Sequence, residues 1–170
     1  MTDSRRDFLV RFATAALTLA GAGCESAVET IDRPQERVLY GPGPYNPDGI
    51  RDGSIEDFLR NVGDRVFFAT DRYDLTAEAK AALDRQIAWL RRYSDHTVRI
   101  EGHCDERGTR EYNLGLGNHR ANTVKRYMVA AGIAPQRLEI VSFGKERPAV
   151  MGANQEAWAK NRRAVAVLTK

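Results

Sequence analysis

The sequence predicts an α+β fold, a two-layer sandwich in which helices cover one mixed four-stranded sheet. Two observations lead to this prediction. Short apolar runs typical of strands recur along the chain, and longer segments between them carry apolar residues at helical spacing. Their order from residue 61 to residue 170 is β-α-β-α-β-(α)-β. A chain of 170 residues that is 42% hydrophobic has room for one such domain and for additional segments.

The first half of the domain contains two predicted strands with a helix between them. Residues 65–69 form a short apolar run, and residues 96–102 alternate apolar and polar side chains. Thr76 is a suitable N-cap for the helix. Its buried face is predicted from apolar residues three or four positions apart, namely Ala79, Leu83, Ile87 and Leu90.

The second half continues with a helix, a strand, a helical turn and a closing strand. The helix ends at Gly132, and its buried face is predicted from Leu114, Ala121, Val124 and Met128. Residues 138–143 and 164–168 are the predicted strands. Between these strands, Trp158 and Ala159 indicate a short helical turn.

Residues 1–23 have the pattern of a signal peptide. Two arginines precede the apolar run 12–22, which is too short to span a membrane. Residues 4–9, SRRDFL, resemble the twin-arginine export motif, and a general-secretion signal that carries two arginines is the alternative. The following GAGC resembles a bacterial lipobox, so we expect lipidation of Cys24. The alternative is a chance cysteine at the end of the signal.

Residues 24–60 are predicted to form a tether that starts at the lipidated cysteine. Four of the six prolines of the chain lie here, and glycines are interleaved with them. Such a composition prevents a regular helix or a central strand. Within this segment, Ile55, Phe58 and Leu59 could form a short helix that docks on the domain.

Charge and cysteine content restrict the partners. The net charge of +3 comes from 26 basic and 23 acidic residues without an isolated basic block, so nucleic acid is not expected as a partner. We expect no cofactor. The chain has two cysteines. With Cys24 lipidated, Cys104 has no partner within the chain, and we expect it to be a buried, unreactive thiol.

The segment 102–120, GHCDERGTREYNLGLGNHR, carries the candidate site. It ends a strand, passes through a turn and enters a helix, with an acid at Asp105 and a base at Arg120. A carboxylate and a guanidinium on one rim can bind a small zwitterion, because arginine pairs with a carboxylate through two parallel hydrogen bonds. Taken singly, Asp105 could instead cap the turn, and Arg120 could form a surface ion pair of little energetic consequence.

Several strings together resemble one family. FFATDRYDL, IEGHCDERGTREYNLGLGNHRA, VSFGKERPAV and KNRRAVAV are similar to the peptidoglycan-associated lipoproteins of Gram-negative bacteria and, more broadly, to the OmpA-like C-terminal domain. The resemblance covers residues 65–170. The chain departs from the common pattern at Ala69, Thr70, Cys104 and His119.

The resemblance implies non-catalytic binding of the diaminopimelate end of peptidoglycan stem peptides. Asp105 takes the position that receives the ammonium group, and Arg120 the position that receives the carboxylate. Asp71 and Tyr73 fall near the same rim. The turn contributes further candidates for the ligand-binding site: Glu106, Arg107, Gly108 and Thr109.

The same resemblance implies a place in the cell. It predicts an outer-membrane lipoprotein, anchored by acyl chains, whose domain faces the periplasm and tethers the membrane to the cell wall. TolB and the Tol–Pal system are the implied partners, with roles in envelope integrity and in constriction at division.

Other classes of function fit the sequence less well. His103, Cys104, Asp105 and His119 could suggest a metal-dependent or Cys/His cell-wall hydrolase, but the usual ligand spacings are absent. His103 and Cys104 are neighbours on a strand and are expected to point to opposite faces. A flagellar stator would need an N-terminal membrane helix with an ionisable residue, and a porin would need upstream barrel strands. We expect neither.

Overall fold

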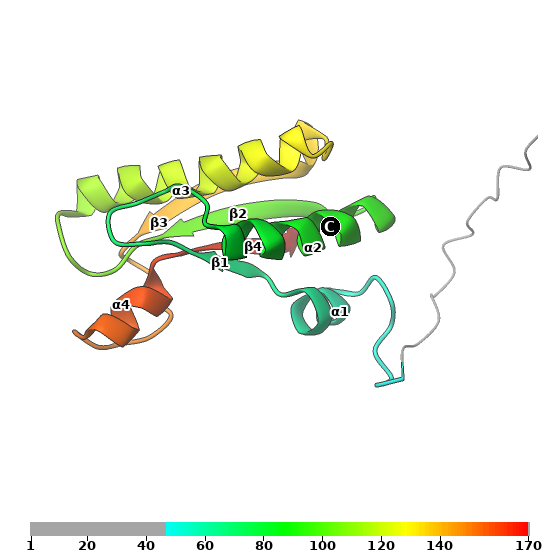
Figure 1. The fold of residues 1–170 in the computed structure, drawn as a ribbon, viewed down its shortest axis with the longest axis horizontal. Helices are drawn as coiled ribbons and strands as arrows, with labels where there is room; N and C mark the ends of the chain where they lie inside the picture. Colours follow the sequence, from blue (N-terminus) through cyan, green and yellow to red (C-terminus); the bar gives the residue numbers. More distant parts are fainter. Residues whose placement is uncertain (1–46, 170) are drawn as a thin grey trace, which may run out of the picture. The chain divides into compact units, whose positions relative to one another are not determined.

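In the computed structural model, residues 47–169 are described. The order of elements confirms the predicted α+β fold and includes the short helix expected before the first strand. The elements, shown in Figure 1, are α1 (Ile55–Asp57), η1 (Phe58–Val62), β1 (Arg65–Phe67), α2 (Ala77–Arg92), β2 (Thr97–His103), α3 (Arg110–Ala130), η2 (Pro135–Arg137), β3 (Leu138–Gly144), α4 (Gln155–Asn161) and β4 (Arg163–Thr169).

The four strands form one mixed sheet in the order β1-β4-β2-β3. The closing strand β4 lies between β1 and β2 and is antiparallel to both. β2 and β3 are parallel, and α3 connects them. Because β4 is antiparallel to both β1 and β2, the C-terminal ends of β1 and β2 lie next to the residues that precede β4. All three segments meet at the same end of the strands.

Apolar side chains from one face of the sheet and from α2 and α3 form the core. All four residues predicted for the buried face of α2 are buried. On α3, Ala121, Val124 and Met128 are buried as predicted, whereas Leu114 is only half-buried. Each large apolar side chain removed from water contributes about 1.5–3 kcal/mol. In the view of Figure 1, α3 runs above the strands and α4 lies below them.

The buried face of α3 runs beyond the apolar core toward the start of the helix. Asn113, Leu116, Gly117 and Arg120 are all buried and recur three or four positions apart. Helical periodicity places them on the face that also carries Ala121. The packing of α3 on the sheet therefore turns polar side chains inward at one end of the domain.

Part of the segment before β1 belongs to the folded domain. Phe58 is completely buried and packs against the ring of Trp89 at 4.9 Å. The buried carboxylate of Asp57 accepts a hydrogen bond of 2.7 Å from the indole of Trp89. The short docking helix predicted here is thus present, but Ile55 and Leu59 are about half exposed, at 53% and 51%. The fold extends into residues whose composition suggested a tether.

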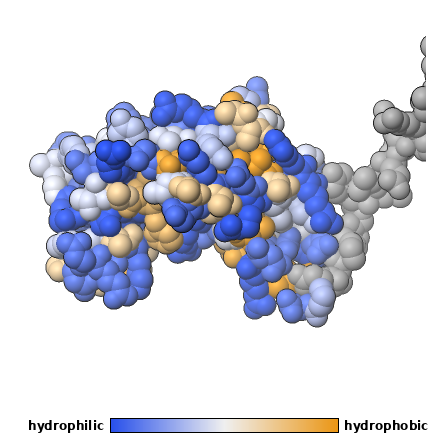
Figure 2. All heavy atoms as spheres, in the orientation of Figure 1, coloured by the Kyte–Doolittle hydropathy of each residue, from blue (hydrophilic) through white to orange (hydrophobic). Residues whose placement is uncertain are grey.

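The predicted signal peptide, Cys24 and most of the predicted tether lie outside the described residues. Within residues 47–169, no helix is both long and apolar enough to cross a membrane. Figure 2 shows one face of residues 47–169. Hydrophilic residues cover most of this face, and hydrophobic residues appear only in small patches.

Candidate functional site

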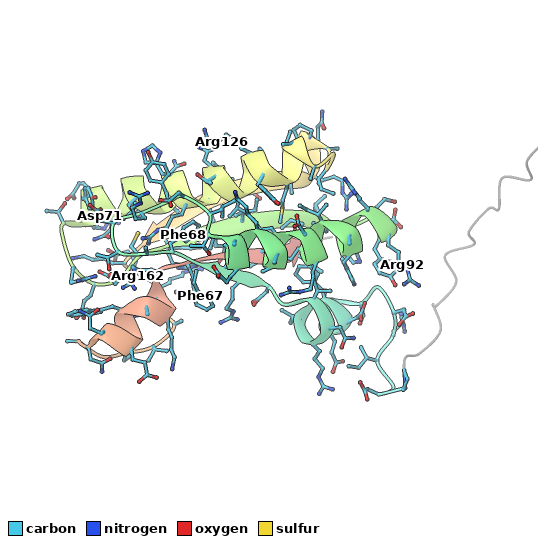
Figure 3. The ribbon with its side chains drawn as sticks, viewed as in Figure 1. Phe67, Phe68, Asp71, Arg92, Arg126 and Arg162 are labelled. Atoms are coloured by element: carbon cyan, nitrogen blue, oxygen red, sulfur yellow. The ribbon has the colours of Figure 1, made fainter. Side chains whose placement is uncertain are left out.

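A pocket of about 320 Å³ lies where the loop after β1, the turn after β2 and the first turns of α3 meet. It brings together Asp71, Asp105, Arg107, Gly108 and Arg120, five of the residues predicted for the site. The other lining residues are Thr70, Cys104, Tyr112, Asn113 and Leu116. Figure 3 labels Asp71 and Arg162, which lie at this end of the domain.

The turn between β2 and α3 is fixed by local hydrogen bonds. Gly108 has a φ of 85°, a left-handed conformation that glycine adopts without strain. The hydroxyl of Thr109 caps α3 by accepting from the amide of Tyr112 at 3.2 Å. The side-chain amide of Asn113 donates to the carbonyls of Arg107 at 2.7 Å and Thr109 at 3.0 Å. Asn113 therefore holds the turn in place from the first turn of α3.

Arg120 is fully buried, at 0% exposure, and its guanidinium is bound by backbone carbonyls. Nε donates to Arg72 O at 2.9 Å, Nη1 to His103 O at 2.8 Å and Nη2 to Ala69 O at 3.2 Å. Among the described residues it forms no ion pair, so it is not the surface salt bridge that the sequence left open. Burial lowers the pKa of Arg120 from its usual value, and the nearby carboxylates of Asp105 and Asp71 offset this effect only in part.

The geometry of Arg120 leaves donors for a ligand. A guanidinium has five N–H groups, and three of them are used by these carbonyls. Nη1 and Nη2 each have a second N–H beyond the carbonyl bonds, and the guanidinium also lies within hydrogen-bonding reach of the Cys104 thiol. The two Nη atoms form the end of the guanidinium fork, which binds a carboxylate through two parallel hydrogen bonds.

Asp105 is nearly buried and is bound by two arginines. Its Oδ1 accepts from the backbone N and the Nε of Arg107, at 3.2 and 3.1 Å. Its Oδ2 accepts from Arg107 Nη2 at 2.8 Å and from Arg162 Nη1 at 3.4 Å. Burial alone would raise the pKa of Asp105, but the hydrogen bonds from Arg107 outweigh it and keep the pKa below its usual value. Asp105 is therefore ionised at neutral pH and already has cationic partners.

Asp71 supplies a second acid at the mouth of the pocket. It is the one non-glycine residue with positive φ among residues 47–169, at 58°. Aspartate tolerates this left-handed conformation better than most residues. Its carboxylate accepts a hydrogen bond from the hydroxyl of Tyr112, in the first turn of α3. The contact connects the loop after β1 to α3 across the pocket.

Three of the predicted residues lie outside the pocket lining. Tyr73 stacks on His119, with ring centroids 5.2 Å apart. Glu106 accepts a hydrogen bond of 3.0 Å from the indole of Trp158. Thr109 is the N-cap of α3. They shape the surroundings of the pocket but do not form its wall.

The sequence did not predict Tyr112, which lines the pocket, or Arg162 and Trp158, which contact the pocket residues Asp105 and Arg107. Arg162 and Trp158 come from the C-terminal part of the chain, which meets the pocket only because β4 pairs between β1 and β2. The string KNRR before the closing strand was the available signal for Arg162. Tyr112 follows the turn directly, in EYN.

The side chains of Cys104 and His103 point in different directions, as expected for neighbours on a strand. The Cys104 thiol faces α3 and donates to Asn113 O at 3.3 Å, whereas the His103 ring stacks on Phe143 of β3. Burial raises the pKa of Cys104 to about 11, so the thiolate is rare at neutral pH. Within residues 47–169, no cluster of three or more acidic, histidine or cysteine side chains suits a metal ion.

His103 gives a pH-dependent stability that can be measured. It is buried, and its Nδ1 has no hydrogen-bond partner among the described residues. Burial, assisted by the positive charges of Arg163 and Arg147, lowers the pKa of His103 to about 4. The unfolded chain takes up this proton near its ordinary pKa of about 6.5, so unfolding is favoured as the pH falls from there toward 4.

We expect the free energy of unfolding to fall by about 3 kcal/mol more in the unchanged chain than in His103→Phe between pH 6.5 and 4. Phenylalanine keeps the stacking on Phe143 but does not titrate. Urea unfolding at several pH values measures the difference. Parallel pH profiles for the two proteins would contradict the assignment.

The domain is of the α+β class, with a mixed sheet under two long helices and a pocket lined by charged residues at the strand ends. The chain matches the OmpA family over residues 67–162. It is 45% identical to the peptidoglycan-associated lipoprotein of Rhizobium meliloti (strain 1021), over 89% of this chain and 83% of that protein. These matches place the chain in the OmpA family, among relatives named peptidoglycan-associated lipoprotein, and confirm the resemblance inferred from the motifs.

Solved structures support the same placement. The peptidoglycan-associated lipoprotein from Burkholderia pseudomallei is 38% identical, with a TM-score of 0.61 over 62% of this chain and 90% of that one. The C-terminal domain of MotB from Helicobacter pylori has a TM-score of 0.59 over 63% of this chain and 84% of that one, at 17% identity. At that identity the likeness to MotB concerns the fold alone.

Proposed function

We propose that this protein is a lipoprotein of the outer membrane that binds the diaminopimelate end of peptidoglycan stem peptides without catalysis. The observation that supports the proposal best is Arg120. Its buried guanidinium has no carboxylate partner among the described residues and keeps two N–H groups beyond its carbonyl bonds. A buried charge is costly, Asp105 and Asp71 offset that cost only in part, and a ligand carboxylate would offset more of it.

The pocket suits an amino-acid head group rather than a large ligand. Its volume of about 320 Å³ is at the lower end of the range for small-molecule sites. Arg120 provides for the carboxylate, while Asp105 and Asp71 are the acids available to an ammonium group. Leu116 and Cys104 add an apolar part of the wall, suited to the methylene groups between the two ends of diaminopimelate.

Anchoring completes the proposed function. Lipidation of Cys24 would hold one end of the chain in the outer membrane, and the pocket would hold the other end on the cell wall. The names of the relatives, which combine lipoprotein and peptidoglycan association, support this arrangement. We propose a periplasm-facing domain with TolB and the Tol–Pal system as partners, in envelope integrity and constriction at division.

Sedimentation with purified peptidoglycan sacculi tests the function. The full chain without its signal should sediment with the sacculi, and Asp105→Ala should remain in the supernatant. Arg110→Ala is the matched control, because Arg110 is 62% exposed and pairs with Glu146 outside the pocket. Retention of Asp105→Ala at the level of the control would reject Asp105 as a binding residue, and failure of the unchanged chain to sediment would reject the function.

A further inference from the structure

In the structure, Arg107 is paired with Asp105, the acid expected to bind the ligand ammonium. Through Nε, Nη2 and its backbone N–H it makes three hydrogen bonds to the Asp105 carboxylate, between 2.8 and 3.2 Å. Asp105 is only 9% exposed in its side chain, whereas Arg107 is 38% exposed. Of the two cations on this carboxylate, Arg107 lines the pocket and is the accessible one.

The second cation, Arg162, is fixed. Its side chain is 11% exposed, and its Nε donates to Phe68 O at 3.1 Å, apart from its contact with Asp105. It does not line the pocket. A ligand ammonium that reaches Asp105 must therefore take the place of Arg107 and not of Arg162.

Arg107 makes two contacts besides those with Asp105, one of them from its Nη2 to Thr70 Oγ1 at 3.5 Å. Its Cζ lies 4.3 Å from the ring centroid of Trp158, a cation–π distance. The indole is itself oriented by its hydrogen bond to Glu106. The guanidinium can thus leave the carboxylate and remain over the Trp158 ring.

Charge balance favours such an exchange. With Arg107 in place, Asp105 has two positive neighbours within 3.4 Å, and an added ammonium would be a third. Like charges at this separation repel, particularly where water is largely excluded. Exchange of one cation for another keeps the local charge unchanged.

We propose that Arg107 is an internal competitor for the ligand ammonium, bound to Asp105 in the empty pocket and released from Asp105 when the ligand binds, while it stays over the Trp158 ring. This inference depends on the proposed function and adds a specificity-determining residue to it. A carboxylate without an ammonium group leaves Arg107 where it is. Only a zwitterion has to displace it.

Competition of this kind lowers the apparent affinity by the fraction of molecules in which Asp105 is free. Partly exposed ion pairs are weak, so the reduction is modest. In Arg107→Gln we expect meso-diaminopimelate to bind about threefold to tenfold more tightly. Pimelate, which has the carboxylates and lacks both ammonium groups, should gain nothing.

Calorimetric titration of the full chain with these two compounds measures the effect, with Arg110→Gln as the control. Weaker or unchanged binding of meso-diaminopimelate to Arg107→Gln overturns the proposal, and so does an equal gain for pimelate. In both cases the unchanged chain still binds meso-diaminopimelate, so the proposed function stands. If neither the unchanged chain nor Arg107→Gln binds meso-diaminopimelate, the proposed function fails together with this inference.

A spectroscopic readout follows the displacement itself. The chain has two tryptophans, and the indole of Trp89 bonds to Asp57, away from the pocket. In an NMR titration the indole N–H signal of Trp158 should shift with meso-diaminopimelate and stay in place with pimelate. An unmoved Trp158 signal at saturation with meso-diaminopimelate contradicts the displacement.

Discussion

Arg120→Lys is expected to weaken binding of meso-diaminopimelate about a hundredfold, close to 3 kcal/mol. The guanidinium uses three N–H groups to reach the carbonyls of Arg72, His103 and Ala69. An ammonium has three N–H groups in all and no planar fork. Lysine keeps the positive charge but cannot satisfy these carbonyls and a carboxylate together. The dissociation constant from calorimetry measures the loss.

A matched control separates this effect from a general effect of arginine replacement. Arg126 lies on the same helix, is exposed and contacts Thr123 at 3.3 Å. Arg126→Lys should bind as the unchanged chain does. Circular dichroism and the unfolding midpoint show whether Arg120→Lys remains folded at the titration temperature. A folded Arg120→Lys protein that binds within threefold of the unchanged chain would contradict the role of the guanidinium.

Gly102→Ala is expected to destabilise the domain by about 3 kcal/mol or more. A Cβ at Gly102 would lie 1.9 Å from the backbone oxygen of Gly117 in α3. Backbone cannot move aside as a flexible side chain can, so α3 would have to lift from β2. Arg120 follows Gly117 by less than one helical turn, so its position depends on this close approach. Urea unfolding measures the loss of stability.

Gly115→Ala provides the control with the opposite sign. It lies in the same helix, and a Cβ there would meet no atom within 4 Å. Alanine is favoured over glycine inside a helix by about 1 kcal/mol, so this variant should be more stable. Equal stability of Gly102→Ala and Gly115→Ala would show that the contact between α3 and β2 is less close than described.

Local patterns predicted the elements well because each depends on near neighbours in the chain. The spacing of Ala79, Leu83, Ile87 and Leu90 marked the buried face of α2, and all four are in the core. The strand and helix order followed from the same kind of evidence. The position of Asp105 and Arg120 in one motif predicted a shared site, and both line one pocket.

The state of those residues was not predictable from the motif. Burial of Arg120 depends on the loop after β1, whose carbonyls come from residues about fifty positions earlier. The pairing of Asp105 with Arg162 depends on β4 entering the middle of the sheet. Such contacts are set by long-range topology, which single-residue patterns do not encode. The sequence predicted that Phe58 could dock on the domain, but its complete burial against Trp89 depends on a long-range contact of the same kind.

One titration tests the central claim, that the pocket recognises an ammonium and a carboxylate on the same carbon. The full chain is titrated with meso-diaminopimelate, with its diamide and with pimelate. The account predicts tightest binding for meso-diaminopimelate, and at least about tenfold weaker binding when the carboxylates are amidated or the ammonium groups removed. Equal affinity for all three compounds would contradict it.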